Sequence, residues 1–466
     1  MDQFKRLTTL LYNDTCAPTS PPALFADLAI EPSDIHSNDI TTILTTYDKL
    51  NVPSTIIDKL NVPSTIIDNI IRRTKQIEKS KIQIINHEYH NIDIDIVSVN
   101  GYNVVCNYNY TSTITRFYDI YTIAPKLIWS ARAGDRRYSD SMLHQCTNII
   151  CLNADHNASI TTCTPFATSL KILSAAHFCG ISDIGLESCT NIENLNANSN
   201  EKITTCEPFA TTLKILSATM TCGINDDGLS SCIHIVQLNA DYNNKITTCV
   251  PFAKSLRMLS ACKMCGIGDE GLRTCINIEN LVAFNNKKIT TCGTFSRSLR
   301  KLYTDDPRGI TDSGLHTSCT IVMLHADNNQ KITTCDPFAK SLRKLYASNL
   351  CGITNRGLRL CYNINELIAS YNSKITTCDP FAESLHTLYA SGTCGITDHG
   401  LRLCNSIKKL VANFNSKITA CDPFAKSLHT LHADGACGIT DHGLRSCFNL
   451  IKLSAIDNQK ITRKYR

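Results

Sequence analysis

Two nearly identical segments of the chain combine cysteine, histidine and aspartate at a spacing that can hold a metal ion or form a redox pair. The first, CGITDHGLRLC, runs from Cys394 to Cys404, and CGITDHGLRSC follows from Cys437 to Cys447. Thiolate and imidazole groups are the usual protein ligands of zinc. In another copy of the segment, however, Ile184 occupies the position of the histidine. Because a ligand position does not accept isoleucine, we expect no metal and no cofactor here.

The cysteines recur in columns with fixed spacing, and 21 of the 25 belong to three such columns. Members of one column are expected two strands apart, roughly 10 Å at about 4.8 Å per strand, which is too far for a disulfide. This distance does not exclude pairing between columns, but the columns fall at different turns of the coil, and we expect most thiols to be reduced and buried. Arg308 interrupts the second column, and Cys319 lies one place out of step in the third. The columns are Cys163, Cys206, Cys249, Cys292, Cys335, Cys378 and Cys421; Cys179, Cys222, Cys265, Cys351, Cys394 and Cys437; and Cys146, Cys189, Cys232, Cys275, Cys319, Cys361, Cys404 and Cys447.

These columns follow from an internal repeat of 43 residues, marked by ITTC from Ile160 onward. Each repeat splits into a first-type half of 22 residues and a second-type half of 21. Both halves begin apolar–x–x–Leu–x–Ala, the pattern of a half-buried strand, and carry Ile at position 12 and Leu or Phe near position 17 for the same core. Asp379 is expected to cap a turn that begins at Pro380. Half-repeats begin at Leu127, Ile149, Leu170, Ile192, Leu213, Ile235, Leu256, Ile278, Leu299, Ile321, Leu342, Ile364, Leu385, Ile407, Leu428 and Leu450.

Asparagine occupies position 9 of every second-type half. A stacked ladder of these side chains can bond to backbone groups that are left unpaired where each strand ends. The ladder comprises Asn157, Asn200, Asn243, Asn286, Asn329, Asn372, Asn415 and Asn458.

The repeated unit resembles the cysteine-containing leucine-rich repeat, which carries I-T-D-x-G-L and a closing cysteine. Here the first cysteine falls one position later, and Ala390 and Ala433 replace leucine at strand position 6. The resemblance implies an α/β leucine-rich-repeat solenoid, or horseshoe, of about 16 units over residues 127–466. Its parallel strands would form the concave face, with short helices or turns on the convex side. The alternation with KITTCDPFAKSL is similar to leucine-rich repeat proteins of giant DNA viruses of amoebae, so we expect a viral protein.

Residues 1–126 differ in composition and are predicted to form an α+β N-terminal region that caps the first repeat. The segment 92–114 alternates with a period of two, and Asn100-Gly101 is a hairpin turn signal. A basic stretch over 70–85 is predicted to be a solvated helix face. In the cysteine-containing family, an F-box that binds a ubiquitin-ligase adaptor precedes the repeats, and PPALFADLAIEPSDI is a poor match to it.

Composition excludes several classes of protein. The 46 basic and 41 acidic residues give a net charge of only +5, which favours no nucleic-acid partner. No apolar run is long enough for a signal peptide or a membrane span, so we expect a cytoplasmic protein, in the host cell if the chain is viral. The sequence contains no phosphate-binding loop and no nucleophile elbow, and we expect no enzymatic activity.

Strand positions 2, 3 and 5 are predicted to face the concave side and to bind a protein partner. In the C-terminal half these positions carry aromatic and basic side chains, which commonly anchor interfaces. An open alternative is that the rings only stack on one another and protect the sheet. The predicted contact residues are Tyr303, Tyr346, Tyr389, His432, Arg300, Arg343, Lys301 and Lys344.

Three functions remain open on sequence grounds. The favoured function is a protein-interaction scaffold with an unidentified protein partner. The first alternative is an F-box-like substrate receptor of a ubiquitin ligase, and the second is a disulfide-bonded extracellular binding protein.

Overall fold

The computed structural model describes residues 92–99, 102–109, 130–132, 138–305 and 308–462. The chain forms two compact units, the first comprising residues 1–217 and 221–224 and the second residues 218–220 and 225–466. The predicted boundary between residues 126 and 127, the basic segment and the F-box-like segment lie outside the described residues.

The first unit contains an antiparallel hairpin and a parallel sheet. Strands β1 (Ile92–Val99) and β2 (Tyr102–Asn109) pair with Val99 opposite Tyr102, so the hairpin predicted at this place is confirmed. Five short strands then pair in parallel and in chain order: β3 (Ser130–Arg132), β4 (Cys151–Asn153), β5 (Ile172–Ser174), β6 (Asn194–Asn196) and β7 (Ile215–Ser217).

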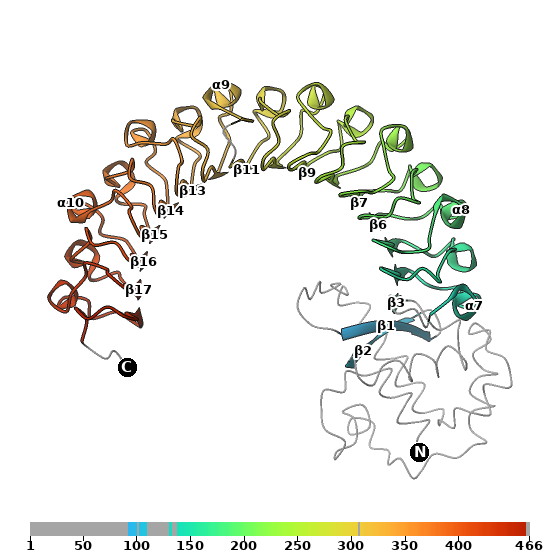
Figure 1. Cartoon of the computed structure of the whole chain (residues 1–466), viewed down its shortest axis with the longest axis horizontal. Coiled ribbons are helices and arrows are strands. Elements are labelled where there is room, and N and C mark those ends of the chain that lie inside the picture. Colours follow the sequence, from blue (N-terminus) through green and yellow to red (C-terminus); the bar gives the residue numbers. More distant parts are fainter. Residues whose placement is uncertain (1–91, 100–101, 110–129, 133–137, 306–307, 463–466) are drawn as a thin grey trace, which may run out of the picture. The chain divides into compact units, whose positions relative to one another are not determined.

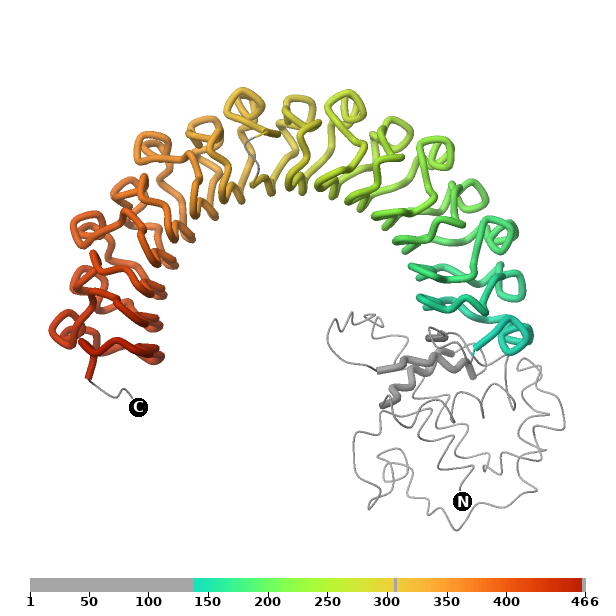
Figure 2. The backbone as a smooth tube through the Cα atoms, viewed as in Figure 1, coloured from blue at the N-terminus to red at the C-terminus, as the bar shows by residue number. Residues whose placement is uncertain are grey.

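The second unit contains eleven parallel strands, again in chain order. Within this unit the strands lie on the inner side of a curve and the short helices on its outer side (Figure 1), and successive coils follow the same path (Figure 2). One coil corresponds to one half-repeat, and its strand occupies positions 3 to 5, so the predicted leucine-rich-repeat solenoid is confirmed. The strands are β8 (Gln237–Asn239), β9 (Met258–Ser260), β10 (Asn280–Val282), β11 (Lys301–Tyr303), β12 (Met323–His325), β13 (Lys344–Tyr346), β14 (Glu366–Ile368), β15 (Thr387–Tyr389), β16 (Lys409–Val411), β17 (Thr430–His432) and β18 (Lys452–Ser454).

Each coil before the last contains one short α-helix or 3-10 helix in its return segment. Those of the first unit are α7 (Asp140–Leu143), η4 (Thr164–Phe166), α8 (Asp183–Leu186) and η5 (Glu207–Phe209). Those of the second unit are η6 (Asp227–Leu229), η7 (Val250–Phe252), η8 (Glu270–Leu272), η9 (Gly293–Phe295), α9 (Asp312–Leu315), η10 (Asp336–Phe338), η11 (Arg356–Leu358), η12 (Asp379–Phe381), α10 (Asp398–Leu401), η13 (Asp422–Phe424) and η14 (His442–Leu444).

The predicted cap at Asp379 is wrong. Cys378 is the N-cap residue of η12, and Asp379 is already the first residue of that helix. The Asp379 N–H donates to Thr377 Oγ1 at 3.1 Å, and its carboxylate accepts a bond of 2.8 Å from the Arg402 guanidinium. Because Arg402 belongs to the next coil, this carboxylate links neighbouring coils on the helix side.

The core of each unit is a stack of identical layers. Strand leucines lie side by side in register, as Leu302 does with Leu324, and both of these are fully buried. Isoleucine at position 12 and the leucine or phenylalanine near position 17 come back to the same core, as predicted. The largest fully buried side chains form one column: Phe166, Phe209, Phe252, Phe295, Phe338, Phe381 and Phe424. The repeat therefore buries a continuous core that neighbouring coils share.

Candidate functional site

The predicted contact residues lie on the inner face of the second unit. We define the strand surface as positions 2, 3 and 5 of the coils that carry β11 to β18. In β11 the side chain of Leu302 is buried, whereas Lys301 is exposed and Tyr303 is half-buried. The alternation of a three-residue strand therefore places positions 3 and 5 together on the surface and position 4 in the core.

An unbroken row of rings crosses this surface at β11, β12 and β13. The pairing register sets His325 between Tyr303 and Tyr346. The His325 ring stacks on both neighbours, with centroid distances of 5.9 Å to Tyr303 and 4.9 Å to Tyr346. Phe284 meets the edges of Tyr303 and His325 at 6.1 Å and 5.4 Å. Burial raises the pKa of Tyr346, which keeps its hydroxyl protonated as a hydrogen-bond donor.

Sequence reasoning missed His325 and Phe284. It compared first-type halves with one another and so found tyrosines two strands apart, with nothing between them. His325 holds position 5 of the intervening second-type half, so tabulating both halves in one alignment would have revealed it. The two tyrosines are consequently packed against a neighbour and not freely exposed.

The row continues at β15 and β17 with gaps filled by aliphatic residues. Ile368 is the register partner of both Tyr346 and Tyr389, and Val411 lies between Tyr389 and His432. The Lys409 ammonium donates to the Tyr389 hydroxyl at 2.6 Å and lies 4.9 Å from the ring centroid. Among the described residues, Tyr389 and His432 therefore each have an aliphatic neighbour along the row and no stacked ring.

The predicted cations line the same surface on the side where the strands begin. Lys344 forms an ion pair of 2.9 Å with Glu366, which raises the pKa of the lysine. The Arg343 guanidinium donates to the Lys340 carbonyl at 3.1 Å, which holds it against the backbone. Arg300 and Lys301 are exposed, and among the described residues no carboxylate forms an ion pair with either.

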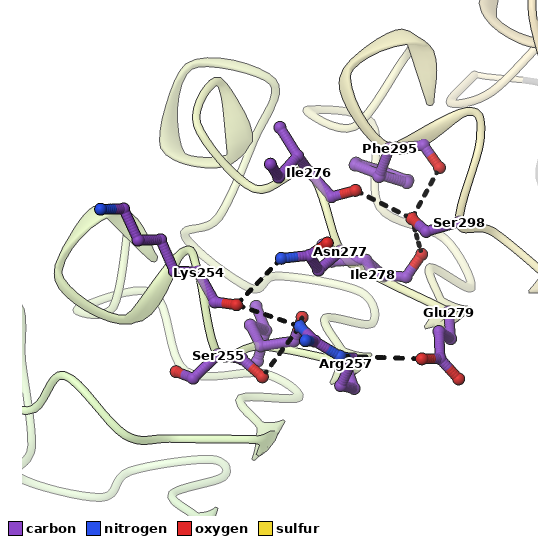
Figure 3. A network of polar contacts seen from close by, with 10 residues as sticks. Lys254, Ser255, Arg257, Ile276, Asn277, Ile278, Glu279, Phe295 and Ser298 are labelled. Carbon is purple, nitrogen blue, oxygen red and sulfur yellow. Dashed lines mark hydrogen bonds and ion pairs between the residues drawn. The ribbon is translucent and has the colours of Figure 1, made fainter.

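In earlier coils, the cations at position 2 form ion pairs with glutamates, and on the strand surface the described cations at this position do not. In the first unit Glu193 bridges Lys171 and Lys214 at 3.2 Å and 2.7 Å. At the start of the second unit Arg257 lies 3.7 Å from Glu279, and its guanidinium also donates to the Lys254 carbonyl at 3.1 Å (Figure 3).

Figure 3 also shows polar contacts of the segments that precede β10 and β11. The Ser298 hydroxyl contacts three carbonyl oxygens, those of Ile276, Ile278 and Phe295, at 2.8–3.1 Å. The Asn277 side chain donates to the Lys254 carbonyl of the preceding coil at 2.9 Å. The same hydroxyl arrangement recurs at Ser169, Thr212, Ser255, Ser341, Ser384 and Ser427. Hydroxyl bonds between coils therefore fix the position at which the strands of the first-type halves enter the sheet.

The asparagine ladder fixes the other end of each strand. All eight asparagines are buried, with at most 5% of any side chain exposed. Asn372 donates to the Ala347 carbonyl of the preceding coil at 2.7 Å and accepts from its own coil's Lys374 N–H at 2.8 Å. Asn415 repeats both bonds with Ala390 and Lys417. One amide side chain thus pairs backbone groups that follow two neighbouring strands, Ala347 after β13 and Lys374 after β14.

Position 8, just beyond the strand, has a left-handed backbone in coil after coil. Most of its occupants have a side chain, such as Tyr371 with φ of 62° and Phe414 with φ of 60°. The next coils carry Gly392 and Gly435 there, with φ of 64° and 62°. A Cβ on either glycine would clash with the ring of the coil before it, so each glycine accommodates both the positive φ and that ring.

Two of the three cysteine columns are in contact, a possibility that the distance within each column left open. The thiol of Cys163 hydrogen-bonds to that of Cys189 in the next coil, and this bond together with burial raises the pKa of Cys163. Burial raises the pKa of Cys179, in the second column, to about 11. None of the 23 cysteines described forms a disulfide, and 21 of them are buried. The same contact joins Cys249 to Cys275, Cys335 to Cys361, Cys378 to Cys404 and Cys421 to Cys447.

The coil of residues 299–320 breaks this pattern. Ser318 occupies the buried place of the third column, and its hydroxyl has no hydrogen-bond partner. Cys319, one residue later, is exposed, and Arg308 is exposed in place of the second-column cysteine. Cys292, which faces this coil, has its pKa raised by burial without a thiol contact.

The described residues contain no group of three histidine, cysteine or acidic side chains placed to hold a metal ion. Within the same residues, no helix has the length and hydropathy needed to cross a membrane. His399 and His442 lie in the outer helices, exposed, where Arg402 and Arg445 approach their imidazoles at 3.0 Å and 3.1 Å.

No family model matches the chain, and no similar protein is found among curated proteins. The solved structures that are similar are leucine-rich repeat proteins. The functional domain of InlJ from Listeria monocytogenes, described as including a cysteine ladder, is 18% identical with a TM-score of 0.40, covering 72% of this chain and 64% of that one. A leucine-rich repeat protein from Bacteroides thetaiotaomicron is 12% identical with a TM-score of 0.33, covering 69% and 46%. The leucine-rich repeat domain of APL1B is 12% identical with a TM-score of 0.30, covering 71% and 85%. This chain thus spans less than two thirds of the first two, and likeness at this level says nothing about function.

Proposed function

We propose that the chain is a protein-interaction scaffold that holds a protein partner on the strand surface of its second unit. The row of Tyr303, His325 and Tyr346 carries this proposal. These rings are half-buried and fixed by stacking, so a partner that covers them removes apolar area from water while ordering few further rotamers. Exposed cations beside such a row supply orientation and specificity.

The alternative, in which the rings only protect the sheet, makes a different prediction for one substitution. Serine occupies position 5 in β5, β7 and β9, and those coils have the same strand and the same register. Tyr346→Ser therefore gives the surface a residue that the fold already accepts there. If the rings only protect the sheet, the substitution affects stability and leaves binding unchanged.

The experiment compares proteins captured from cell extracts by the immobilised full-length chain, by Tyr346→Ser and by the control Ser260→Ala. Each captured protein is then purified and its affinity is measured against all three. We expect at least one protein to bind Tyr346→Ser about 5–30-fold more weakly, equivalent to about 1–2 kcal/mol for a central aromatic anchor, and to bind Ser260→Ala normally. Equal affinities of every captured protein for all three chains would overturn the proposal.

We further propose that the scaffold acts in the cytoplasm, in that of the host if the chain is virus-encoded. The support is chemical: the described cysteines are free and nearly all buried as thiols, a state that a reducing compartment maintains. A protein with this many free thiols does not suit an oxidising compartment, where mispairing would compete with folding. Localisation of a tagged chain in expressing cells tests this directly.

A further inference from the structure

Charge on the strand surface is concentrated along the side where the strands begin. Positions 2 and 3 of the coils carrying β11 to β18 hold seven lysine or arginine side chains and a single carboxylate, a formal charge of +6 in a chain whose total is +5. The carboxylate, Glu366, pairs with Lys344 alone. The cations are Arg300, Lys301, Arg343, Lys344, Lys408, Lys409 and Lys452.

Beyond the strand ends, at position 7, some of these coils carry acidic side chains next to the strand surface. Asp327 and Asp434 hold position 7, and each accepts a bond from a backbone N–H of the next coil, that of Ser348 at 2.5 Å and that of Ile456 at 2.8 Å. These carboxylates are fixed by the fold. The surface therefore has a positive side at the strand beginnings, an aromatic row in the middle and a negative side at the strand ends.

We infer that the partner binds through an extended acidic protein segment that runs across the strands along the positive side. This inference rests on the proposed function and specifies the chemistry of its partner. An acidic segment gains attraction there and is repelled by the carboxylates at the strand ends, so the surface fixes its path. Its neighbouring apolar side chains then meet the row of rings.

The spacing of the cations indicates how the acidic residues are arranged. Cationic pairs lie on β11, β13 and β16, and Lys452 lies on β18, so successive sites are two or three strands apart, roughly 10–14 Å at about 4.8 Å per strand. An extended chain rises about 3.3 Å per residue. An acidic residue at every third or fourth position therefore matches the surface, and about ten residues span it.

A protein segment fits this surface better than a single-stranded nucleic acid does. Nucleic-acid binding of that kind uses the open faces of aromatic rings as stacking platforms for bases. Here His325 covers one face of Tyr303 and one face of Tyr346, so neither ring offers both faces to stacked bases. A tyrosine hydroxyl can bond to the carboxylates and backbone groups of a protein segment.

The test uses labelled twelve-residue peptides and fluorescence anisotropy with the full-length chain. One peptide carries glutamate at every third position and tyrosine at two others, and a second has the same composition with all glutamates at one end. A single-stranded oligonucleotide of equal charge is the third probe. We expect the spaced peptide to bind at least about fivefold more tightly than the other two, with an affinity that falls as salt rises.

Charge-reversed variants locate the binding. Lys301→Glu with Lys409→Glu should weaken the spaced peptide at least about tenfold. Lys340→Glu with Lys426→Glu is the matched control, because these lysines hold the same repeat position as Lys254, whose ammonium points away from the Arg257–Glu279 pair in Figure 3. Circular dichroism confirms that both double variants are folded.

Three results would overturn the inference: equal weakening by both double variants, no difference between the two peptides, or tighter binding of the oligonucleotide. These outcomes are separable from failure of the proposed function. A captured protein that is lost with Tyr346→Ser but is unaffected by Lys301→Glu with Lys409→Glu would leave the scaffold proposal standing and refute the acidic segment.

Discussion

Replacing Asn372 with alanine should destabilise the second unit by an amount that the structure allows to be worked out. The side chain is fully buried, and it serves the Ala347 carbonyl at 2.7 Å and the Lys374 N–H at 2.8 Å. Alanine leaves the buried Ala347 carbonyl unpaired, whereas the Lys374 N–H belongs to an exposed residue and can bond to water. At about 1–3 kcal/mol for one unsatisfied buried group, the expected loss is about 1–3 kcal/mol.

Asn449 provides a matched control. Its side chain also donates to a carbonyl of the preceding coil, that of Lys426 at 2.7 Å, but it is exposed. Water can replace this bond, so Asn449→Ala should cost less than about 0.5 kcal/mol. The two substitutions remove the same side chain and a bond of the same length, and they differ in burial.

Urea denaturation gives the global effect, and hydrogen exchange measured by mass spectrometry gives its location. Because the stability of stacked repeats is roughly a sum over neighbouring units, Asn372→Ala should lower protection first in residues 342–384. Equal urea midpoints and equal exchange for Asn372→Ala and Asn449→Ala would refute the argument that burial of the ladder makes its bonds structural.

Four further predictions follow from features of single coils. Gly392→Ala should lower stability by about 1–3 kcal/mol in urea denaturation, because the new side chain is strained by the positive φ and clashes with the Tyr371 ring. Adding Tyr371→Ala should recover only the part due to the clash, and full recovery would mean that the positive φ carries no strain. Ser318→Cys should raise stability by about 1 kcal/mol in the same assay, because it removes a buried hydroxyl without a partner; a loss would show that the hydroxyl is satisfied. Alkylation of the native chain, followed by peptide mapping, should modify Cys319 before any other cysteine among the described residues. Burial raises the pKa of Cys351 to about 12. The stability that this thiol contributes is therefore complete below its unfolded pKa near 8.5 and is lost as pH rises toward 12, at about 1.4 kcal/mol per pH unit. The urea midpoint should accordingly fall between pH 7.5 and pH 10, and a constant midpoint would contradict this prediction.

The strands, their register and the core were predictable because the same apolar positions recur from one half-repeat to the next. Leucine at position 4 and isoleucine at position 12 recur in every half-repeat from Ile149 onward, whereas the first half-repeat has Ser130 and Tyr138 there. Apolar periodicity of this kind has few structural solutions. The position of Ser318 was also readable in principle, since it sits where the other copies have a cysteine. Aligning Cys319 with the column concealed it.

Contacts between coils were harder to predict, because sequence spacing does not give the distance between side chains of different positions. The thiol contact between Cys163 and Cys189 joins residues 26 positions apart that lie in neighbouring coils. The hydroxyl ladder at Ser298 was missed because serine at a loop position carries no apolar signal. The positive φ of Tyr371 was missed for the opposite reason, since a tyrosine there gives no hint of a left-handed backbone.

The bonds between coils also determine how such a chain can change in length. Asn372 reaches from a second-type half to the first-type half before it, and Asp398 reaches from a first-type half to Thr419 in the second-type half after it. Removal of a single half would place two halves of one type next to each other. The bonds made by residues such as Asn372 and Asp398 would then lack their partners at the junction. Removal or duplication of 43 residues keeps every partner in place. Gain and loss of repeats should therefore proceed by whole double coils, so the reach of the strand surface grows or shrinks in steps of two strands, roughly 10 Å each.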